Sequence, residues 1–303
     1  MSQVLDKYSH IQFEGARTSI HPIERRARPV REAPSSSIFA TPYRPRAPIV
    51  SPADRLLLEY LFARVHLNNA AYRPGALGRR IPACLRALQA RSPAEAIRRL
   101  EQDPAALDLA LNALLIGVTS FFRDQPVFNH LASSALPELL RVSPRPRILS
   151  VGCSDGAEPY SLAICLLELN VDSFDLRGID CRRRAIIRSC AGYYPSSLLA
   201  GIPPLLREKY FDHLPRLCRV KSSLRQRVQF QLADAFIHVP QPPYDLIACR
   251  NFAIYLEHAA AARLWRRLHS SLRPGGLLLT GKAEHPTSGF LRAGPCLFRK
   301  ATP

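Results

Sequence analysis

Apolar residues recur every three or four positions over residues 52–115. The segments LLLEYLFARV and AEAIRRLEQ show this spacing without competing β-branched runs, which predicts amphipathic helices. Ser92, followed by Pro93 and by Glu95 three residues on, has the pattern of a helix start. LDLALNALLIGV predicts another apolar helix, packed against the next domain. We therefore expect a small helical domain over residues 51–116.

The pattern changes after Pro146, where short apolar runs alternate with helical runs. RILSVG, FDLRGID, VQFQLAD, YDLIACRN and GGLLLTGK each predict a strand that ends in glycine or polar residues. Strands alternating with helices predict an α/β domain with a Rossmann-like, mostly parallel sheet covered by helices on both faces. We expect this domain over residues 146–303, with a small insert near 205–225. Ligands of such sheets bind beyond the C-terminal ends of the strands.

Residues 1–50 differ from the rest of the chain. They are rich in Arg, Pro and Ser and show no sustained apolar period. Such a segment cannot bury enough apolar surface to offset the entropy lost on ordering, so we expect a disordered basic tail. A solvated extension is favoured over an electrostatic tether.

Composition narrows the class of protein further. Apolar residues make up 47% of the chain, but no run of about 18 of them predicts a membrane span. The first residues lack the basic-then-apolar order of a secretory signal, and the eight cysteines show neither C-x-x-C pairs nor a zinc-like His spacing. We expect a cytoplasmic protein with reduced thiols and no metal. The formal net charge of +18 favours a polyanionic partner, either nucleic acid, an acidic protein or anionic lipid.

Candidate chemistry begins where the first predicted strand ends. Gly152 and Gly156 allow a tight turn and close approach of the backbone to a ligand, although the G-x-G-x-x-G fingerprint is absent. The second strand ends at Asp180, 24 residues after Gly156, where a carboxylate can accept both ribose hydroxyls. Alternatively, Asp180 only caps the following helix. The loop and the acid together favour an adenosine ligand.

Further polar residues follow the later strands. Asp234 ends VQFQLAD, where it would lie near an adenine edge. Arg250 and Asn251 end YDLIACRN, and Tyr255 follows one helical turn later. Arg250 or Arg123 could hold a carboxylate through paired hydrogen bonds. For either arginine, a solvated surface position is the alternative in so basic a chain.

Four runs resemble a known family when taken in order. They are VTSFFRD (118–124), DGAEPYSLA (155–163), CRNFAIYLE (249–257) and TGKAE (280–284). They resemble the CheR-type chemoreceptor protein-glutamate O-methyltransferases. The resemblance extends over roughly residues 55–300, all but the tail, and the ordered combination of T-x-F-F-R, E-P-Y-S and C-R-N-x-x-I-Y is highly specific.

The resemblance implies that S-adenosyl-L-methionine lies across the strand ends, under a linker over residues 117–145. Thr119 and Arg123 would contact this cofactor from the linker, and Glu158 would hold its methionine amino group. Asp180 matches the ribose acid. The implied cofactor positions are Gly117, Thr119, Arg123, Glu158, Asp180, Asp234, Ala235, Arg250 and Asn251.

The resemblance also implies the reaction, which is esterification of glutamate side chains on an acidic, chemoreceptor-like partner. The acceptor carboxylate is ionised at neutral pH, so no strong general base is needed. The main task is to align it with the methyl group. Arg123, Arg250 and Tyr255 are the candidate catalytic residues, which would orient the acceptor. A monomer is expected.

Several positions depart from the family pattern. Gly117 replaces an asparagine, Ala157 replaces the first glutamate of G-E-E-P, and Lys282 replaces the histidine of G-H-S-E. Pro82 is expected to interrupt a helix of the N-terminal domain. The segment FDHLPRLCRVKSS is short and lacks a glycine-rich loop, so we expect no binding of a receptor C-terminal peptide.

Two alternatives remain from the sequence. The departures raise the possibility of a catalytically weak or inactive relative that only binds cofactor or a partner. The net charge and the string Gln241-Pro242-Pro243-Tyr244 suggest a nucleic-acid methyltransferase, in which a tyrosine could stack on a flipped base. Here, however, the string precedes its strand, which favours a proline-rich turn and makes a nucleic-acid partner the weaker interpretation.

Overall fold

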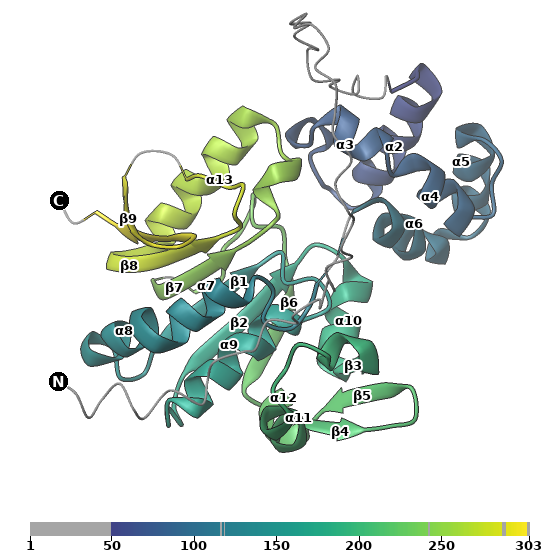
Figure 1. The fold of residues 1–303 in the computed structure, drawn as a ribbon. Coiled ribbons are helices and arrows are strands. Elements are labelled where there is room, and N and C mark those ends of the chain that lie inside the picture. Colours follow the sequence, from purple (N-terminus) through teal and green to yellow (C-terminus); the bar gives the residue numbers. More distant parts are fainter. Residues whose placement is uncertain (1–49, 116, 118, 242, 287–288, 302–303) are drawn as a thin grey trace, which may run out of the picture.

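The computed structural model describes residues 50–115, 117, 119–241, 243–286 and 289–301. A helical domain and a larger α/β domain lie side by side (Figure 1). The tail predicted for residues 1–50 lies outside the described residues, apart from residue 50.

The helical domain is built from short helices whose ends follow the local sequence. Its helices are α2 (Pro52–Arg64), α3 (Pro74–Gly78), α4 (Ile81–Ala87), α5 (Pro93–Gln102) and α6 (Leu107–Leu114). The Ser92 hydroxyl accepts a hydrogen bond from the Glu95 backbone N–H at 3.2 Å, which confirms the predicted helix start. The chain also breaks between α3 and α4, directly before Pro82, as predicted.

The α/β domain is organised by one seven-stranded sheet. Its strands are β1 (Arg147–Val151), β2 (Asp175–Asp180), β6 (Val228–Leu232), β7 (Tyr244–Cys249), β8 (Leu272–Thr280), β9 (Phe290–Gly294) and β10 (Leu297–Lys300). The order is β6-β2-β1-β7-β8-β10-β9. The first five strands pair in parallel, and β10 pairs antiparallel with both of its neighbours. The predicted mostly parallel sheet is therefore confirmed.

Helices cover both faces of this sheet. They are α7 (Gln125–His130), α8 (Leu136–Val142), α9 (Ala157–Glu168), α10 (Arg183–Ala191) and α13 (His258–Ser271). Ile148 belongs to one apolar core, with residues of α7, α8 and α9. Its neighbour Leu149 belongs to a second core, with residues of α13 and of the helical domain. Successive side chains of a strand point to opposite faces of the sheet. One face therefore shares its apolar core with the helical domain.

The segment expected as a linker, 117–145, is largely helical. Helices α7 and α8 are joined by a π-helical turn at Leu131–Ala135, and their apolar residues pack into the core under the sheet. Only residues up to Asp124 serve as a connecting loop. The physical reason is that Val127, Phe128 and their neighbours bury an apolar face that a loop would expose.

A second sheet forms the predicted insert. It contains β3 (Tyr193–Pro195), β4 (Phe211–His213) and β5 (Leu217–Val220), in the order β3-β5-β4, with helices α11 (Pro204–Tyr210) and α12 (Ser222–Arg225) beside it. The insert starts at Tyr193, earlier than the expected range of 205–225. Strands β4 and β5 form a hairpin closed by a hydrogen bond from the Leu214 N–H to the Leu217 carbonyl at 2.9 Å.

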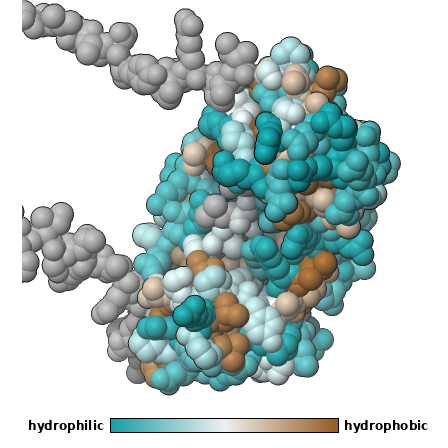
Figure 2. Space-filling model, turned by 90° about the vertical axis from the view of Figure 1, so that its right-hand side faces the viewer, coloured by the Kyte–Doolittle hydropathy of each residue, from teal (hydrophilic) through white to brown (hydrophobic). Residues whose placement is uncertain are grey.

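One face of the molecule is seen in space-filling view in Figure 2. Figure 2 shows that the face carrying the helical domain is mostly hydrophilic, with apolar side chains in small separate groups. Among the described residues, no helix has both the length and the apolar character needed to cross a membrane.

The loop that leads to α7 is held by two phenylalanines. Phe121 packs edge-on against Tyr194 and Phe211, at 4.9 and 5.0 Å between ring centroids. Phe122 is 1% exposed and packs against Phe128, while its backbone N–H donates to the Ser161 hydroxyl at 3.0 Å. These contacts fix the loop to the core of the α/β domain.

We expect Phe122→Ala to lower the free energy of unfolding by about 3–5 kcal/mol, because it leaves a cavity in a closed core. Chemical denaturation monitored by circular dichroism measures this change. Leu205→Ala is the matched control, since Leu205 is 78% exposed and should change stability by less than about 0.5 kcal/mol. Equal effects of the two substitutions would contradict the assigned packing.

Candidate active site

A cavity lies at the C-terminal ends of the parallel strands, against the helical domain. The space between its lining residues, counted together with the solvent-open part, is about 760 Å³. The helical domain contributes Tyr72, Ala76, Leu77, Arg80, Leu114 and Leu115 to its wall. The predicted site residues that line it are Asp180, Asp234, Ala235, Asn251 and Tyr255. The mixed apolar and polar lining suits an organic ligand.

The loop after β1 contributes Gly152 to the lining of the cavity. Gly152 adopts a φ of 67°, and a side chain there would meet the Phe252 ring at 3.5 Å. Gly156 adopts a φ of 89° immediately before α9, and a Cβ there would come 2.9 Å from Ser189. Both positions therefore favour glycine, as the sequence predicted for a tight turn. The Ser154 hydroxyl in this loop donates to the Gly117 carbonyl at 2.9 Å.

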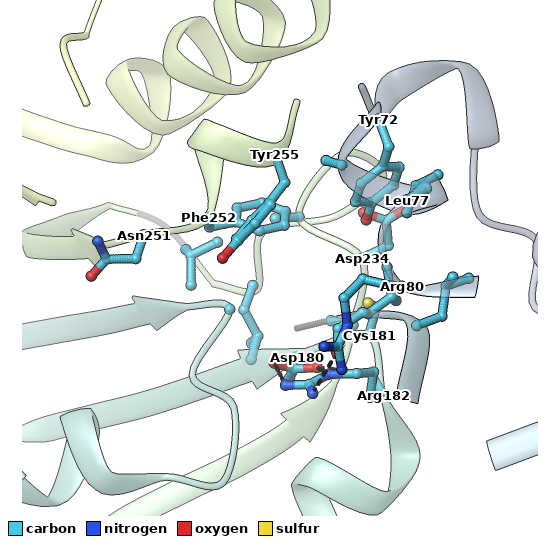
Figure 3. A pocket seen from close by; sticks show the side chains of 18 residues that line it. Tyr72, Leu77, Arg80, Asp180, Cys181, Arg182, Asp234, Asn251, Phe252 and Tyr255 are labelled. Carbon is cyan, nitrogen blue, oxygen red and sulfur yellow. Dashed lines mark hydrogen bonds and ion pairs between the residues drawn. The ribbon is translucent and has the colours of Figure 1, made fainter. Parts of the chain in front are cut away.

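Asp180 ends β2 and lies buried at the wall of the cavity. Its carboxylate accepts hydrogen bonds from the backbone N–H groups of Ser154 and Arg182, both at 2.9 Å. The second donor, Arg182, is the N-cap residue of α10, which begins at Arg183 and has no side-chain capping hydrogen bond. The helix-capping alternative for Asp180 is therefore wrong. The Arg182 side chain also pairs with this carboxylate (Figure 3).

Asp234 follows β6, the strand paired with β2, where the neighbouring Ala233 N–H donates to the Asp180 carbonyl at 3.1 Å. Its carboxylate accepts the Phe236 backbone N–H at 2.9 Å. Burial raises the pKa of Asp234, while that hydrogen bond and the Arg267 charge oppose the shift. Ala235 follows it and is buried. Both Asp234 and Ala235 line the cavity.

The turn after β7 carries Asn251 and Tyr255. In Figure 3 the Tyr255 hydroxyl points into the cavity, whereas the Asn251 side chain points away from Asp180. Asn251 has a φ of 56°, and its buried Oδ1 has no hydrogen-bond partner.

Glu284 holds this turn in place. Its buried carboxylate accepts the backbone N–H groups of Asn251 at 2.7 Å and of Phe252 at 2.8 Å. It also accepts the N–H of Ile254 at 3.3 Å and of Gly281 at 2.8 Å. A buried carboxylate with so many donors is a strong anchor. Sequence reasoning assigned no role to Glu284, although the TGKAE run contains it.

Arg250 belongs to a separate group behind the cavity wall. Its terminal nitrogens bond Glu158 Oε2 at 3.3 Å, Asp124 Oδ2 at 2.9 Å and the Arg123 carbonyl at 2.8 Å. The Ser150 hydroxyl donates to Glu158 Oε1 at 2.8 Å. The Arg250 side chain is only 2% exposed, so its guanidinium serves internal partners rather than the carboxylate of a ligand.

Lys282 extends this group to the surface. Its Nζ lies 2.9 Å from Asp124 Oδ1, while its side chain remains 67% exposed. The departure at this position therefore supplies a cation that pairs with the loop before α7.

The lining of the cavity does not include the remaining predicted residues. Gly117 approaches the β1 loop through its carbonyl. Thr119 and Arg123 are half-buried in the loop before α7. Arg123 reaches the Arg250 group through its backbone carbonyl. The structure thus brings together one set around Asp180 and another around Glu158.

The helical domain is attached to the rim of the cavity by the backbone. The Arg73 N–H donates to the Tyr255 carbonyl at 2.9 Å, and the Glu257 N–H donates to the Ala71 carbonyl at 2.9 Å. The Arg73 Nε also donates to the Leu256 carbonyl at 2.7 Å. These contacts place Tyr72 opposite Tyr255. Sequence reasoning missed this wall because no local pattern reports contacts across 183 residues.

Tyr244, the last residue of the proline-rich string, does not line the cavity. Tyr244 is the first residue of β7 and is fully buried, at the end of the strand opposite Asn251. A buried ring there cannot stack on a base.

The fold and the cavity define a class. A seven-stranded sheet with one antiparallel strand, and with a cavity at its parallel strand ends, is that of a Rossmann-like S-adenosylmethionine-dependent methyltransferase. Residues 117–289 match the family described as CheR methyltransferase, SAM binding domain. The chain belongs to this CheR methyltransferase family, for which S-adenosyl-L-methionine is the cofactor.

Curated relatives agree with this assignment. Chemotaxis protein methyltransferase 2 of Pseudomonas aeruginosa is 34% identical over 66% of this chain and 75% of its own length. A probable chemotaxis protein methyltransferase of Rhizobium etli is 33% identical over 64% of this chain and 74% of its own. An uncharacterized 104.1 kDa protein of Rhodobacter capsulatus is 29% identical over 78% of this chain. That match spans only 26% of the Rhodobacter protein.

We expect Glu284→Gln to lower the free energy of unfolding by about 3 kcal/mol, because an amide nitrogen would face N–H donors that then lose their acceptor. Chemical denaturation measures the change. Glu138→Gln is the control, since the Glu138 side chain is 53% exposed and pairs only at the surface with Arg299. An unchanged stability of the Glu284 variant would rule out its anchoring role.

Proposed function

We propose that this chain transfers the methyl group of S-adenosyl-L-methionine to glutamate side chains of a chemoreceptor-like signalling protein. The products would be glutamate methyl esters. One observation carries the proposal: Asp180, Asp234 and the Tyr255 hydroxyl meet in a single cavity at the strand ends of a CheR-family chain. The chemotaxis names of the relatives supply the acceptor class.

The residues present fit the cofactor. The cavity combines an apolar wall for an adenine ring with carboxylates at positions suited to a ribose diol and an adenine edge. Asp180 would hold the ribose, and Asp234 with Ala235 the adenine. The unpartnered, buried Oδ1 of Asn251 and the carboxylate of Glu158 are acceptors suited to an ammonium group. When bound, S-adenosyl-L-methionine supplies an electrophilic methyl group.

Gly117 and Thr119 would act through the backbone, whereas Arg250 would act through its side chain. Gly117 and Thr119 precede the loop held by Phe121, so they can close over one side of the ligand. Arg250 would act indirectly, because its guanidinium holds Glu158 and the loop at Asp124. We therefore propose Arg250 as a positioning residue.

The acceptor needs orientation more than activation. A glutamate carboxylate is already ionised near neutral pH, so no residue has to remove a proton from it. Tyr255 can donate its hydroxyl to that carboxylate from within the cavity. Arg123 is proposed to attract and align it from the neighbouring loop. Alignment of this kind is worth several kcal/mol of the barrier, on the order of 7 kcal/mol in favourable cases.

The charge of the chain supports an acidic acceptor. A second cavity beside Asp234 is lined by Arg263, Arg266 and Arg267 of α13, and these three arginines are exposed. The whole chain has a formal net charge of +18. This arginine-lined face would attract an acidic protein surface and accelerate its association with the chain. We propose that the chain acts as a monomer in the cytoplasm on such a partner.

We expect transfer of label from methyl-labelled S-adenosyl-L-methionine to the cytoplasmic fragment of a chemoreceptor, in a form released as methanol by mild base. Esters hydrolyse under these conditions, whereas methylated amines do not. Scintillation counting of the volatile product measures the transfer. Receptor fragments whose accepting glutamates are replaced by alanine serve as the control.

Two outcomes of this assay would refute the proposed reaction. Base-stable label on the receptor would indicate a different acceptor atom. Label transferred instead to DNA or RNA would support the nucleic-acid alternative.

We expect Arg123→Ala to lower kcat by about 100-fold, because the acceptor loses alignment, while the unfolding midpoint changes little. Initial rates of ester formation and thermal unfolding measure the two effects. Arg184→Ala removes the same charge from an exposed position of α10 and serves as the control. Equal rates for the two variants would exclude the proposed role of Arg123.

A further inference from the structure

The carboxylate of Asp180 is already saturated by groups of this chain. Besides the two backbone N–H donors, it accepts the Arg182 Nε at 3.0 Å on Oδ1 and the Arg182 Nη2 at 3.2 Å on Oδ2. Each carboxylate oxygen thus accepts two hydrogen bonds, which fills the roughly four lone-pair positions available. Both side chains are buried, at 5% and 6% exposure.

The guanidinium of Arg182 occupies a space that a neighbouring glycine leaves open. A Cβ at Gly117 would lie 2.2 Å from Arg182 Nη1 and 2.6 Å from Nη2, so any other residue there would displace the guanidinium. Arg182 Nη1 also donates to the Leu115 carbonyl at 3.2 Å. Gly117 and Arg182 therefore form a matched pair across the cavity wall.

A ribose diol needs the same positions. Its two hydroxyls would donate to the two oxygens of Asp180, where Arg182 Nε and Nη2 now donate. Two sets of donors cannot share one side of the carboxylate, and the backbone donors occupy the other positions. Binding of the adenosyl group through Asp180 thus requires the guanidinium to withdraw.

We propose that Arg182 competes with the ribose diol for Asp180 and so lowers the affinity of the cavity for the adenosyl group. This inference rests on the proposed function, since it concerns the affinity of the same cavity for its cofactor. The cavity is competent for the adenosyl group only in molecules whose Arg182 has left Asp180. The apparent dissociation constant is raised in inverse proportion to that competent fraction.

The competition predicts an affinity that improves when Arg182 is removed. We expect Arg182→Ala to bind S-adenosylhomocysteine about tenfold more tightly than the unsubstituted chain, in isothermal titration calorimetry. Arg183→Ala is the matched control, because it removes the same charge from an exposed neighbouring position and should leave the affinity unchanged.

A second variant covers the case in which Arg182→Ala fails to fold. Gly117→Ala keeps both partners of the ion pair, and Gly117 does not adopt a positive φ, so alanine fits the backbone. Its methyl group should push the guanidinium aside and tighten S-adenosylhomocysteine binding in the same direction, by a smaller factor. Circular dichroism establishes that each variant is folded.

The ligand hydroxyls give the decisive comparison. We expect Arg182→Ala to improve the binding of adenosine but not of 2′,3′-dideoxyadenosine, which lacks the competing donors. Equal gains for both nucleosides, or weaker binding of S-adenosylhomocysteine by the folded variants, would overturn the inference. If neither the unsubstituted chain nor any folded variant binds S-adenosylhomocysteine, the proposed function fails and the inference fails with it.

Discussion

Burial of both faces of the parallel sheet is the constraint on which the rest of this structure depends. Successive residues of β1, β7 and β8 enter different apolar cores, so these strands carry few polar side chains along their length. Polar groups are therefore concentrated where the strands end, because only there can they meet solvent, a ligand or one another. Asp180, Asp234 and Asn251 all stand at such ends, and the helical domain closes over that edge.

The buried charged side chains at this edge hold the surrounding turns and loops in place. A buried carboxylate is costly unless it is fully hydrogen-bonded, and here each one gathers backbone N–H groups or an arginine. Glu284 fixes the turn that carries Tyr255, while Arg250 ties Glu158 to the loop before α7. The cavity is thus preorganised by ion pairs and hydrogen bonds that lie just outside it.

Two of the departures from the family pattern acquire partners in three dimensions. Lys282 pairs with Asp124 across the loop before α7. Gly117 makes room for the guanidinium of Arg182, which lies 65 positions later in the chain. These residues look like losses when each is read alone. In the structure each of them makes a contact with a residue distant in the sequence. Asp180 and Asp234 still line the cavity.

Local periodicity determined much of the fold, because helix and strand spacing depend on near neighbours. The Ser92 helix start, the break before Pro82, the parallel sheet and the glycine turn after β1 all follow from such patterns, and ordered motifs identified the family. The extent of the insert and the helices within 117–145 were decided by apolar packing. Only tertiary structure turned Arg250 inward, placed the Arg182 guanidinium against Gly117 and brought Tyr72 to the cavity. Those outcomes depend on contacts between distant residues, and in so basic a chain the sequence alone does not distinguish one arginine from another.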